Sequence, residues 1–245
     1  MPRAYRHFLP DHIWHITHRC HKQEFLLRFA KDRACWLHWL FQARQRFGLS
    51  VLNYMVTCNH VHLLVRDCGK HAIPRSMQLV AGRTAQAYNQ RKSRKGAFWE
   101  DRYHATAVQS DSHLFRCLAY IDLNMVRAGI VRHPEQWPHC GYHEIQQPPE
   151  RCRIVDHEAL LELCGLQSIA ALRSAHSDWI AAELKRQASQ HRDPRWTESI
   201  AVGQREFVEN IQRRLGCRAA GRKSIELERG YQLKEVAAAY DTNRP

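Results

Sequence analysis

The stretch SVLNYMVTCNHVHLLVR, residues 50–66, holds two short apolar segments separated by Cys58 and Asn59. Each segment has the length and the content of β-branched and aromatic residues that are typical of a strand. Two such segments with so short a connection predict a β-hairpin. The stretch therefore places two antiparallel strands side by side.

The second strand of this hairpin carries two histidines, His60 and His62, separated by one residue. Alternate residues of a strand share a face, so both imidazoles lie together, opposite the core-facing Val61, Leu63 and Val65. Two imidazoles side by side on a solvent-accessible sheet face can bind one divalent cation. Because the chain has 17 histidines, this spacing also arises by chance, and the pair alone does not establish a metal site.

Periodicity predicts the elements on either side of the hairpin. The predicted order is β-α-β-β-α-β-α, with a strand at 12–19, helices at 30–48, 73–91 and 111–129, and one or two strands around Trp99–Arg102. This order favours an α+β fold, in which a ferredoxin-like antiparallel sheet has its helices on one face, over a doubly wound parallel sheet.

The character of the sequence changes after Pro148 and Pro149, which we interpret as a domain boundary. Residues 1–149 would form one domain, and residues 150–245 a mostly helical C-terminal region. The segments HEALLELCGL (157–166) and LKEVAAAY (233–240) are among its predicted helices. The residues alone assign no role to this region.

The composition is that of a soluble globular protein, with 44% hydrophobic and 25% charged residues. No run of about 18 apolar residues occurs, so we predict no membrane association through a spanning helix. The first residues lack the apolar core of a signal peptide. The nine cysteines are odd in number and include no C-x-x-C pair, which favours reduced thiols and a cytoplasmic location over a disulfide framework.

The positive charge is concentrated in one part of the chain. Residues 1–149 carry 21 basic and 10 acidic side chains, a net charge of +11, whereas residues 150–245 carry 16 and 14, a net charge of +2. Charge that served solubility alone would not be confined in this way. An excess of this kind favours a polyanionic partner, most simply nucleic acid.

The predicted helix at 111–129 carries a polar strip of residues three or four positions apart: Arg116, Tyr120, Asn124 and Arg127. A tyrosine oxygen can attack a phosphodiester when a bound cation polarises the phosphate. The side-chain oxygen of Asn124 suits a hard cation as a third ligand beside two imidazoles. An amphipathic helix with an ordinary surface tyrosine gives the same pattern, so periodicity leaves both interpretations open.

A zinc site is an alternative use of the histidines. It would combine Cys58, His60, His62 and Cys68 and would give stoichiometric zinc in the purified protein. The cysteine spacing fits no structural zinc pattern well, and neighbouring strand residues point to different faces. We therefore favour the first interpretation.

Three segments occur in an order and at distances that resemble one protein family. They are NHVHLLV (59–65), FWEDRYHATAV (98–108) and AYIDLNMVRAGIV (119–131). In this respect the chain resembles the REP-associated tyrosine transposases, which are single-tyrosine HUH transposases related to the IS200-like insertion-sequence enzymes. The resemblance covers about the first 145 residues. It implies an RRM-like variant of the ferredoxin-like sheet, in agreement with the order of elements.

The resemblance also implies roles for individual residues. His60, His62 and Asn124 would hold Mg²⁺ or Mn²⁺, and Tyr120 would be the nucleophile that cleaves single-stranded DNA, joins its 5′ phosphate and leaves a free 3′ hydroxyl. In the family a proline follows the asparagine, whereas this chain has Met125. Without proline we expect the helix to run straight through Asn124.

The resemblance implies a single-stranded DNA partner that contains a REP-type hairpin. We expect basic side chains of the loop 91–96 and of the flanking motifs to contact it: Arg91, Lys92, Arg94, Lys95, Arg102, Arg116 and Arg127. The C-terminal region would either contribute to hairpin recognition or cover the sheet. A catalytically silent, domesticated relative that binds hairpins as a regulator is the alternative function. Whether the chain acts as a monomer or as a homodimer is open at this stage.

Overall fold

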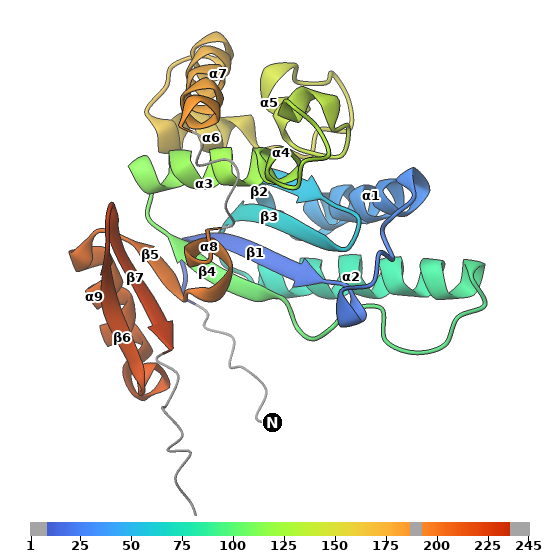
Figure 1. The fold of residues 1–245 in the computed structure, drawn as a ribbon, viewed down its shortest axis with the longest axis horizontal. Helices are drawn as coiled ribbons and strands as arrows, with labels where there is room; N and C mark the ends of the chain where they lie inside the picture. Colours follow the sequence, from blue (N-terminus) through green and yellow to red (C-terminus); the bar gives the residue numbers. More distant parts are fainter. Residues whose placement is uncertain (1–8, 187–192, 236–245) are drawn as a thin grey trace, which may run out of the picture.

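The computed structural model describes residues 9–186 and 193–235 (Figure 1). Its centre is an antiparallel sheet of four strands: β1 (Ile13–Arg19), β2 (Ser50–Val56), β3 (His60–Arg66) and β4 (His104–Val108). Their spatial order is β2-β3-β1-β4, which is that of a ferredoxin-like unit. The register places Thr17 opposite His62, so these two residues share one face of the sheet.

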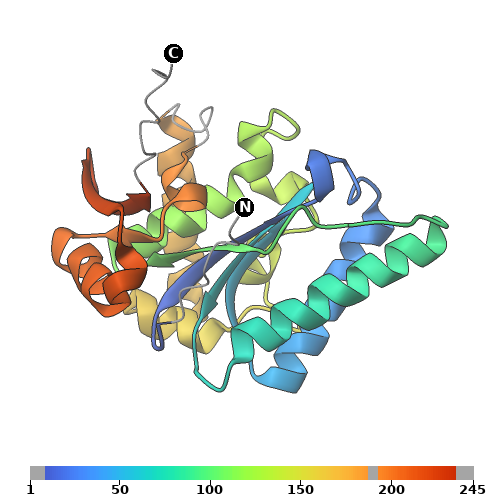
Figure 2. The ribbon, with the colours of Figure 1, turned by 90° about the horizontal axis from the view of Figure 1, so that it is seen from below.

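Two long helices cover the other face of the sheet. α1 (Ala30–Phe47) and α2 (Ala72–Arg91) pack side by side (Figures 1 and 2). α1 buries Trp36, Leu40 and Ala43, which are three or four residues apart and so form one apolar stripe. The helix ends at Gly48, whose φ of 66° is the left-handed conformation common after a helix.

The face that carries the histidines is covered by α3 (Ser112–Asp122) and the short α4 (Asn124–Arg127). Above α3 lie α5 (Tyr142–Gln146), α6 (His157–Cys164) and α7 (Ile169–Lys185) (Figure 1). Phe115 of α3 stacks on Trp179 of α7, with ring centroids 4.3 Å apart. Below this contact the fully buried carboxylate of Asp122 accepts hydrogen bonds from His176 Nε2 at 2.8 Å and Asn53 Nδ2 at 3.0 Å. These contacts fix the C-terminal end of α3 to both α7 and the sheet.

The C-terminal region also extends the sheet. After α8 (Arg195–Glu198), β5 (Ala201–Gly203) pairs in parallel with β4. α9 (Arg205–Leu215) follows, and the hairpin of β6 (Arg222–Leu227) and β7 (Gly230–Glu235) completes the order β2-β3-β1-β4-β5-β7-β6. The described residues also form the 3-10 helices η1 (His21–Gln23), η2 (Pro134–Gln136) and η4 (Gly216–Ala219).

The predicted α+β class, the antiparallel sheet and the largely helical C-terminal region are confirmed. The predicted placement of the helices on one face of the sheet is correct for α1 and α2, whereas α3 lies on the opposite face. The strand predicted around Trp99–Arg102 is wrong: Trp99 forms a single bridge to Cys20, and the strand begins at His104. All nine cysteines are free thiols.

The helix predicted at 233–240 is also wrong where the structure describes it. Leu233, Lys234 and Glu235 belong to β7, and residues 236–240 lie outside the described residues. Leucine, lysine and glutamate favour helices, but pairing with β5 and β6 overrides this local preference. The predicted boundary after residue 149 stays a prediction, although the sheet contains strands from both sides of it.

The helix predicted at 111–129 is interrupted at Leu123, so the expected straight helix is wrong. Leu123 has φ −81° and ψ 6°, and it separates α3 from α4 without any proline. Leu123 and Met125 are both buried. In a continuous helix two residues that are two positions apart point in divergent directions, so burying both side chains favours the break. The guanidinium of Arg127 donates to the carbonyl oxygen of Tyr120.

No helix in the described part of the chain is long and apolar enough to span a membrane.

Candidate active site

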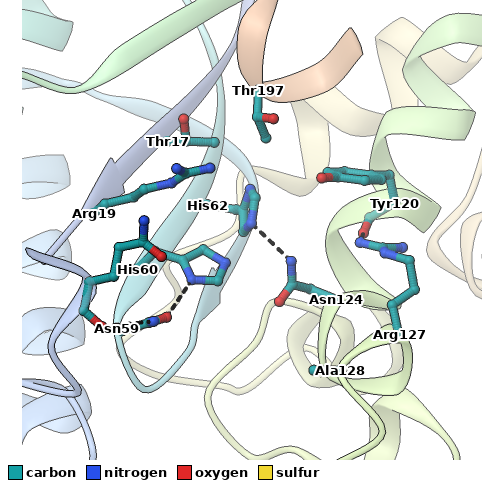
Figure 3. Close-up of a pocket in the computed structure, with 11 residues that line it drawn as sticks. Thr17, Arg19, Asn59, His60, His62, Tyr120, Asn124, Arg127, Ala128 and Thr197 are labelled. Carbon is teal, nitrogen blue, oxygen red and sulfur yellow. Dashed lines mark hydrogen bonds between the residues drawn. The ribbon is translucent and has the colours of Figure 1, made fainter. Parts of the chain in front are cut away.

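A cavity of about 410 Å³ opens where β1 and β3 meet α3 and α4. It is lined from β1, η1, β3, α3, α4, α8 and two residues next to them by Thr17, Arg19, Gln23, Asn59, His60, His62, Tyr120, Asn124, Arg127, Ala128 and Thr197 (Figure 3). The histidine pair of β3 and the polar strip of α3 and α4 therefore face each other across one cavity. Sequence analysis predicted both groups, and the tertiary structure brings them together.

The two histidines differ in their exposure to solvent. Their ring centroids are 4.9 Å apart and the rings are nearly perpendicular. His60 is partly buried, whereas His62 is 2% exposed. The expected solvent-accessible sheet face is therefore wrong for His62, because α3 and α4 cover that part of the sheet. A ligand reaches His62 only through the cavity.

Hydrogen bonds on the far side of each ring fix which nitrogen faces the cavity. His60 Nδ1 lies 2.7 Å from Asn59 Oδ1, which can only accept. The proton of a neutral His60 therefore lies on Nδ1, and the lone pair lies on Nε2. Thr57 Oγ1 lies 3.0 Å from the same Nδ1 and donates to the His60 carbonyl oxygen. The turn before β3 thus orients the ring of its first histidine.

A second chain of contacts orients His62, and it begins in the C-terminal region. His15 Nδ1 lies 2.8 Å from the carbonyl oxygen of Trp196, so His15 donates there. His15 Nε2 lies 2.9 Å from His62 Nδ1, and the two rings are stacked. When His15 is neutral, its Nε2 accepts the proton of His62 Nδ1, and the lone pair of His62 lies on Nε2. A hydrogen bond from the ring nitrogen that faces away from the metal is characteristic of histidines that bind metals.

Burial keeps both inner histidines neutral. Desolvation, and then the nearby charge of His60, holds the pKa of His62 well below its usual value of 6.5. Desolvation also lowers the pKa of His15 to about 3, although its hydrogen bond to Trp196 opposes this change. A neutral imidazole is the form that can ligate a cation. The sequence does not single out His15, because only the pairing of β1 with β3 reveals its contact with His62.

Asn124 lies where the predicted third ligand has to be. Its Nδ2 is 2.9 Å from His62 Nε2 (Figure 3). In this orientation the amide donates to His62, whereas ligation of a cation needs the amide oxygen. Rotation of the amide by about half a turn exchanges the two atoms. The break at Leu123 thus leaves Asn124 beside the histidine despite the absence of the proline.

Tyr120 is 8% exposed, and its hydroxyl group points into the cavity (Figure 3). Its ring is nearly perpendicular to that of His62, with centroids 5.8 Å apart. The guanidinium of Arg127 lies 4.1 Å from the centre of the tyrosine ring. A positive charge at this position would stabilise negative charge on the tyrosine oxygen.

The basic side chains predicted to contact DNA are placed unequally. Arg127 lies in the cavity, and Arg116 lies one turn before Tyr120 and outside it. Arg102 lines a neighbouring cavity of about 330 Å³ together with Arg19, which also lines the first cavity. Arg19 was not among the residues predicted to contact DNA, although it lies on the same face of β1 as His15 and Thr17.

The basic loop 91–96 lies apart from the cavity residues. Arg91 forms an ion pair with Asp32, and Arg94 forms one with Glu24 at 3.6 Å. Lys92 lies over the ring of Phe29, 5.3 Å from its centre. Lys95 is exposed. Two of the four charges are thus partly neutralised within the protein, which leaves Lys92 and Lys95 as the better candidates for contacts with DNA.

The alternative zinc site is not formed. Cys58 and Cys68 lie beyond opposite ends of the seven-residue strand β3. Across residues 9–186 and 193–235, no group of three or more His, Cys, Asp or Glu side chains is placed to hold a metal ion. The predicted donors, His60, His62 and Asn124, all line the first cavity.

Comparison with known proteins agrees with this geometry. Residues 10–124 match the family described as "Transposase IS200 like". No curated protein sequence matches the chain significantly. Among solved structures, a REP-associated tyrosine transposase bound to a REP hairpin shares 15% sequence identity at a TM-score of 0.51, with 64% of this chain and 94% of that chain covered. This likeness shows a common fold.

A second solved structure, a Deinococcus radiodurans R1 protein assigned as a transposase, has 15% identity and a TM-score of 0.35 over 52% of this chain and 97% of that chain. At that score it adds nothing to the fold assignment. The matched family spans β1 to the first residue of α4, and so includes His60, His62, Tyr120 and Asn124. Residues 10–124, just under half of the chain, are therefore similar to the IS200-like transposase family.

Proposed function

We propose that this chain is a metal-dependent transposase that cleaves and rejoins single-stranded DNA through a covalent link to Tyr120. The observation that carries the proposal is that Tyr120, His60, His62 and Asn124 line one cavity, although they come from three elements. A nucleophile beside a site for a divalent cation is the arrangement that phosphoryl transfer needs.

The donor set suits Mg²⁺ or Mn²⁺. His60 and His62 would offer the lone pairs of their Nε2 atoms, and Asn124 its amide oxygen after rotation of the amide. Imidazole ligands favour Mn²⁺ at least as much as Mg²⁺. When bound, the cation would polarise the phosphate and hold it in line with the tyrosine oxygen.

In the cleavage step the oxygen of Tyr120 forms a bond to phosphorus, and the bond from phosphorus to the 3′ oxygen breaks. The tyrosine proton goes to solvent or to the departing 3′ oxygen, which becomes a hydroxyl group. Arg127 stabilises negative charge on the tyrosine oxygen from its position over the ring. Attack by another 3′ hydroxyl reverses the step, so the energy of the phosphodiester bond is conserved.

The substrate that we propose is single-stranded DNA with a hairpin of the REP type. The solved REP-associated relative is bound to such a hairpin, and the two proteins share a fold. The net charge of +13 supports a polyanionic substrate.

The test is a covalent-adduct assay with labelled hairpin DNA and Mn²⁺. We expect the wild-type protein to form an adduct that survives denaturing electrophoresis, and Tyr120→Phe to form none. Tyr103→Phe is the matched control, because Tyr103 is equally buried but does not line the cavity. An adduct with Tyr120→Phe would refute the nucleophile, and tight binding without an adduct under any divalent cation would favour a hairpin-binding regulator.

A further inference from the structure

A second cavity, of about 380 Å³, adjoins the candidate active site. Tyr120 and Arg127 line both cavities. The rest of the second cavity comes from α3 and from the C-terminal region: the end of α7, α8 and the turn between β6 and β7. Its walls carry five arginines and three carboxylates. It is therefore a positively charged extension of the site that holds the tyrosine.

Two of the carboxylates are already paired within the cavity wall. Asp193 lies 2.6 Å from Arg195, and Glu183 lies 3.1 Å from Arg186. These pairs neutralise part of the charge. Arg229 is exposed, and its side chain forms no ion pair within the described residues. The cavity thus keeps positive charge that no carboxylate of its own cancels.

The turn that carries Arg229 is fixed against α3. Gly230 lies so close to His113 that a Cβ atom built on it would be 2.5 Å from His113 Nε2. Arg116 donates from Nη1 to the carbonyl oxygen of Arg229 at 3.1 Å, and from Nε to the carbonyl oxygen of Ser112 at 3.1 Å. The two-residue turn at 228–229 is therefore docked on the helix that carries Tyr120.

The surroundings of Arg116 also indicate crowded positive charge. Its pKa is lowered first by desolvation and then by the charges of Arg195 and Arg229. A bound anion would relieve this repulsion. Guanidinium groups bind phosphate oxygens through paired hydrogen bonds, which makes phosphate the anion best suited to an arginine-lined cavity.

We propose that the second cavity binds a backbone phosphate of the same DNA strand that Tyr120 attacks. Because Tyr120 lies in the wall of both cavities, a strand with one phosphate at the histidines can continue past the tyrosine toward Arg186 and Arg229. The C-terminal region would then take part in substrate binding. This inference rests on the proposed function, which supplies the strand at Tyr120.

The experiment compares the salt dependence of DNA binding without a divalent cation. The variant Arg186→Gln/Arg229→Gln removes two charges of the cavity but keeps the backbone carbonyl that Arg116 binds. The matched control, Arg173→Gln/Arg214→Gln, removes two exposed charges from α7 and α9 that line neither cavity. The probe is a labelled hairpin with single-stranded flanks, titrated between about 50 and 200 mM salt.

We expect the cavity variant to flatten the slope of log K against log salt concentration by about 0.7, because one lost phosphate contact on a single strand contributes about 0.7. Affinity at the lower salt concentration should fall by about tenfold. The control variant should change neither quantity by as much. Arg186→Lys/Arg229→Lys, which keeps both charges, should restore most of the slope.

An unchanged slope in the cavity variant, with an unchanged melting temperature, would overturn the inference. An equal change in the control variant would do the same, because it would show a general effect of charge. The Tyr120 adduct separates this inference from the proposed function. An adduct in the wild type together with an unchanged slope refutes only the second cavity, whereas a flattened slope without any adduct refutes only the proposed cleavage.

Discussion

Replacing His15 with phenylalanine tests how the fold prepares His62 to bind a cation. The substitution keeps an aromatic ring in the core but removes two hydrogen bonds. The Trp196 carbonyl oxygen loses one of two donors and keeps Thr106 Oγ1 at 3.2 Å, whereas His62 Nδ1 loses its acceptor. His62 could then carry its proton on either nitrogen, and the tautomer with the proton on Nε2 cannot ligate a metal ion.

The structure sets the size of the effect. Loss of the group that orients a metal-binding histidine lowers the affinity for a metal ion by about 10- to 100-fold. The group left without its partner, His62 Nδ1, is buried, since His62 is 2% exposed. An unsatisfied buried group costs about 1–3 kcal/mol, so the free energy of unfolding should fall by about 1–3 kcal/mol.

Isothermal titration with Mn²⁺ measures the affinity, and urea unfolding measures the stability. His104→Phe is the control, because His104 contacts the carbonyl oxygen of Ser199 at 2.9 Å in the same C-terminal segment but does not contact His62. His15→Gln should recover part of the affinity, since an amide can both donate to Trp196 and accept from His62. A folded His15→Phe protein that binds Mn²⁺ as tightly as the wild type would refute the reasoning.

Three further predictions concern pH, the support of α3 and the break before α4. Because burial lowers the pKa of His15 to about 3, the unfolded chain takes up a proton below pH 6.5 that the folded chain does not. The free energy of unfolding should therefore fall by about 2 kcal/mol between about pH 7.5 and 5, measured by urea unfolding with EDTA. The fall should be smaller in His15→Phe. Asp122→Ala should lower the free energy of unfolding by about 3–5 kcal/mol in the same assay, because it leaves the buried His176 without its carboxylate; a loss below about 1 kcal/mol would contradict this. Met125→Pro should keep Mn²⁺ affinity within about twofold, because a proline is tolerated in the first turn of α4; a loss of affinity as large as that of Asn124→Ala would show that Met125 is needed to place the amide.

The central elements could be predicted from the sequence, because each has its own apolar pattern. β2, β3, α1 and α2 each have a complete apolar period and a clear end, such as Gly48 after α1. The short strands β5 to β7 lack such a pattern. β5 has three residues, and β6 is largely exposed, so their conformation depends on pairing with neighbours rather than on their own sequence.

Part of the candidate site was likewise predictable from the sequence, and part was revealed only by the tertiary structure. The sequence predicts His60, His62, Tyr120 and Asn124 as site residues, because their spacings place them on one face of a strand or a helix and three motifs together resemble one family. Only the tertiary structure brought β3 and α3 to one cavity, and only it revealed His15.

The contribution of the C-terminal region was likewise invisible in the sequence. The carbonyl oxygen of Trp196 orients His15, and a turn at 228–229 docks on α3. Backbone atoms act at both positions, and a backbone carbonyl leaves no mark in the type of residue that carries it. The sequence by itself therefore determined which side chains can do chemistry, whereas long-range packing decided which of them meet and which nitrogen of each histidine faces the cavity.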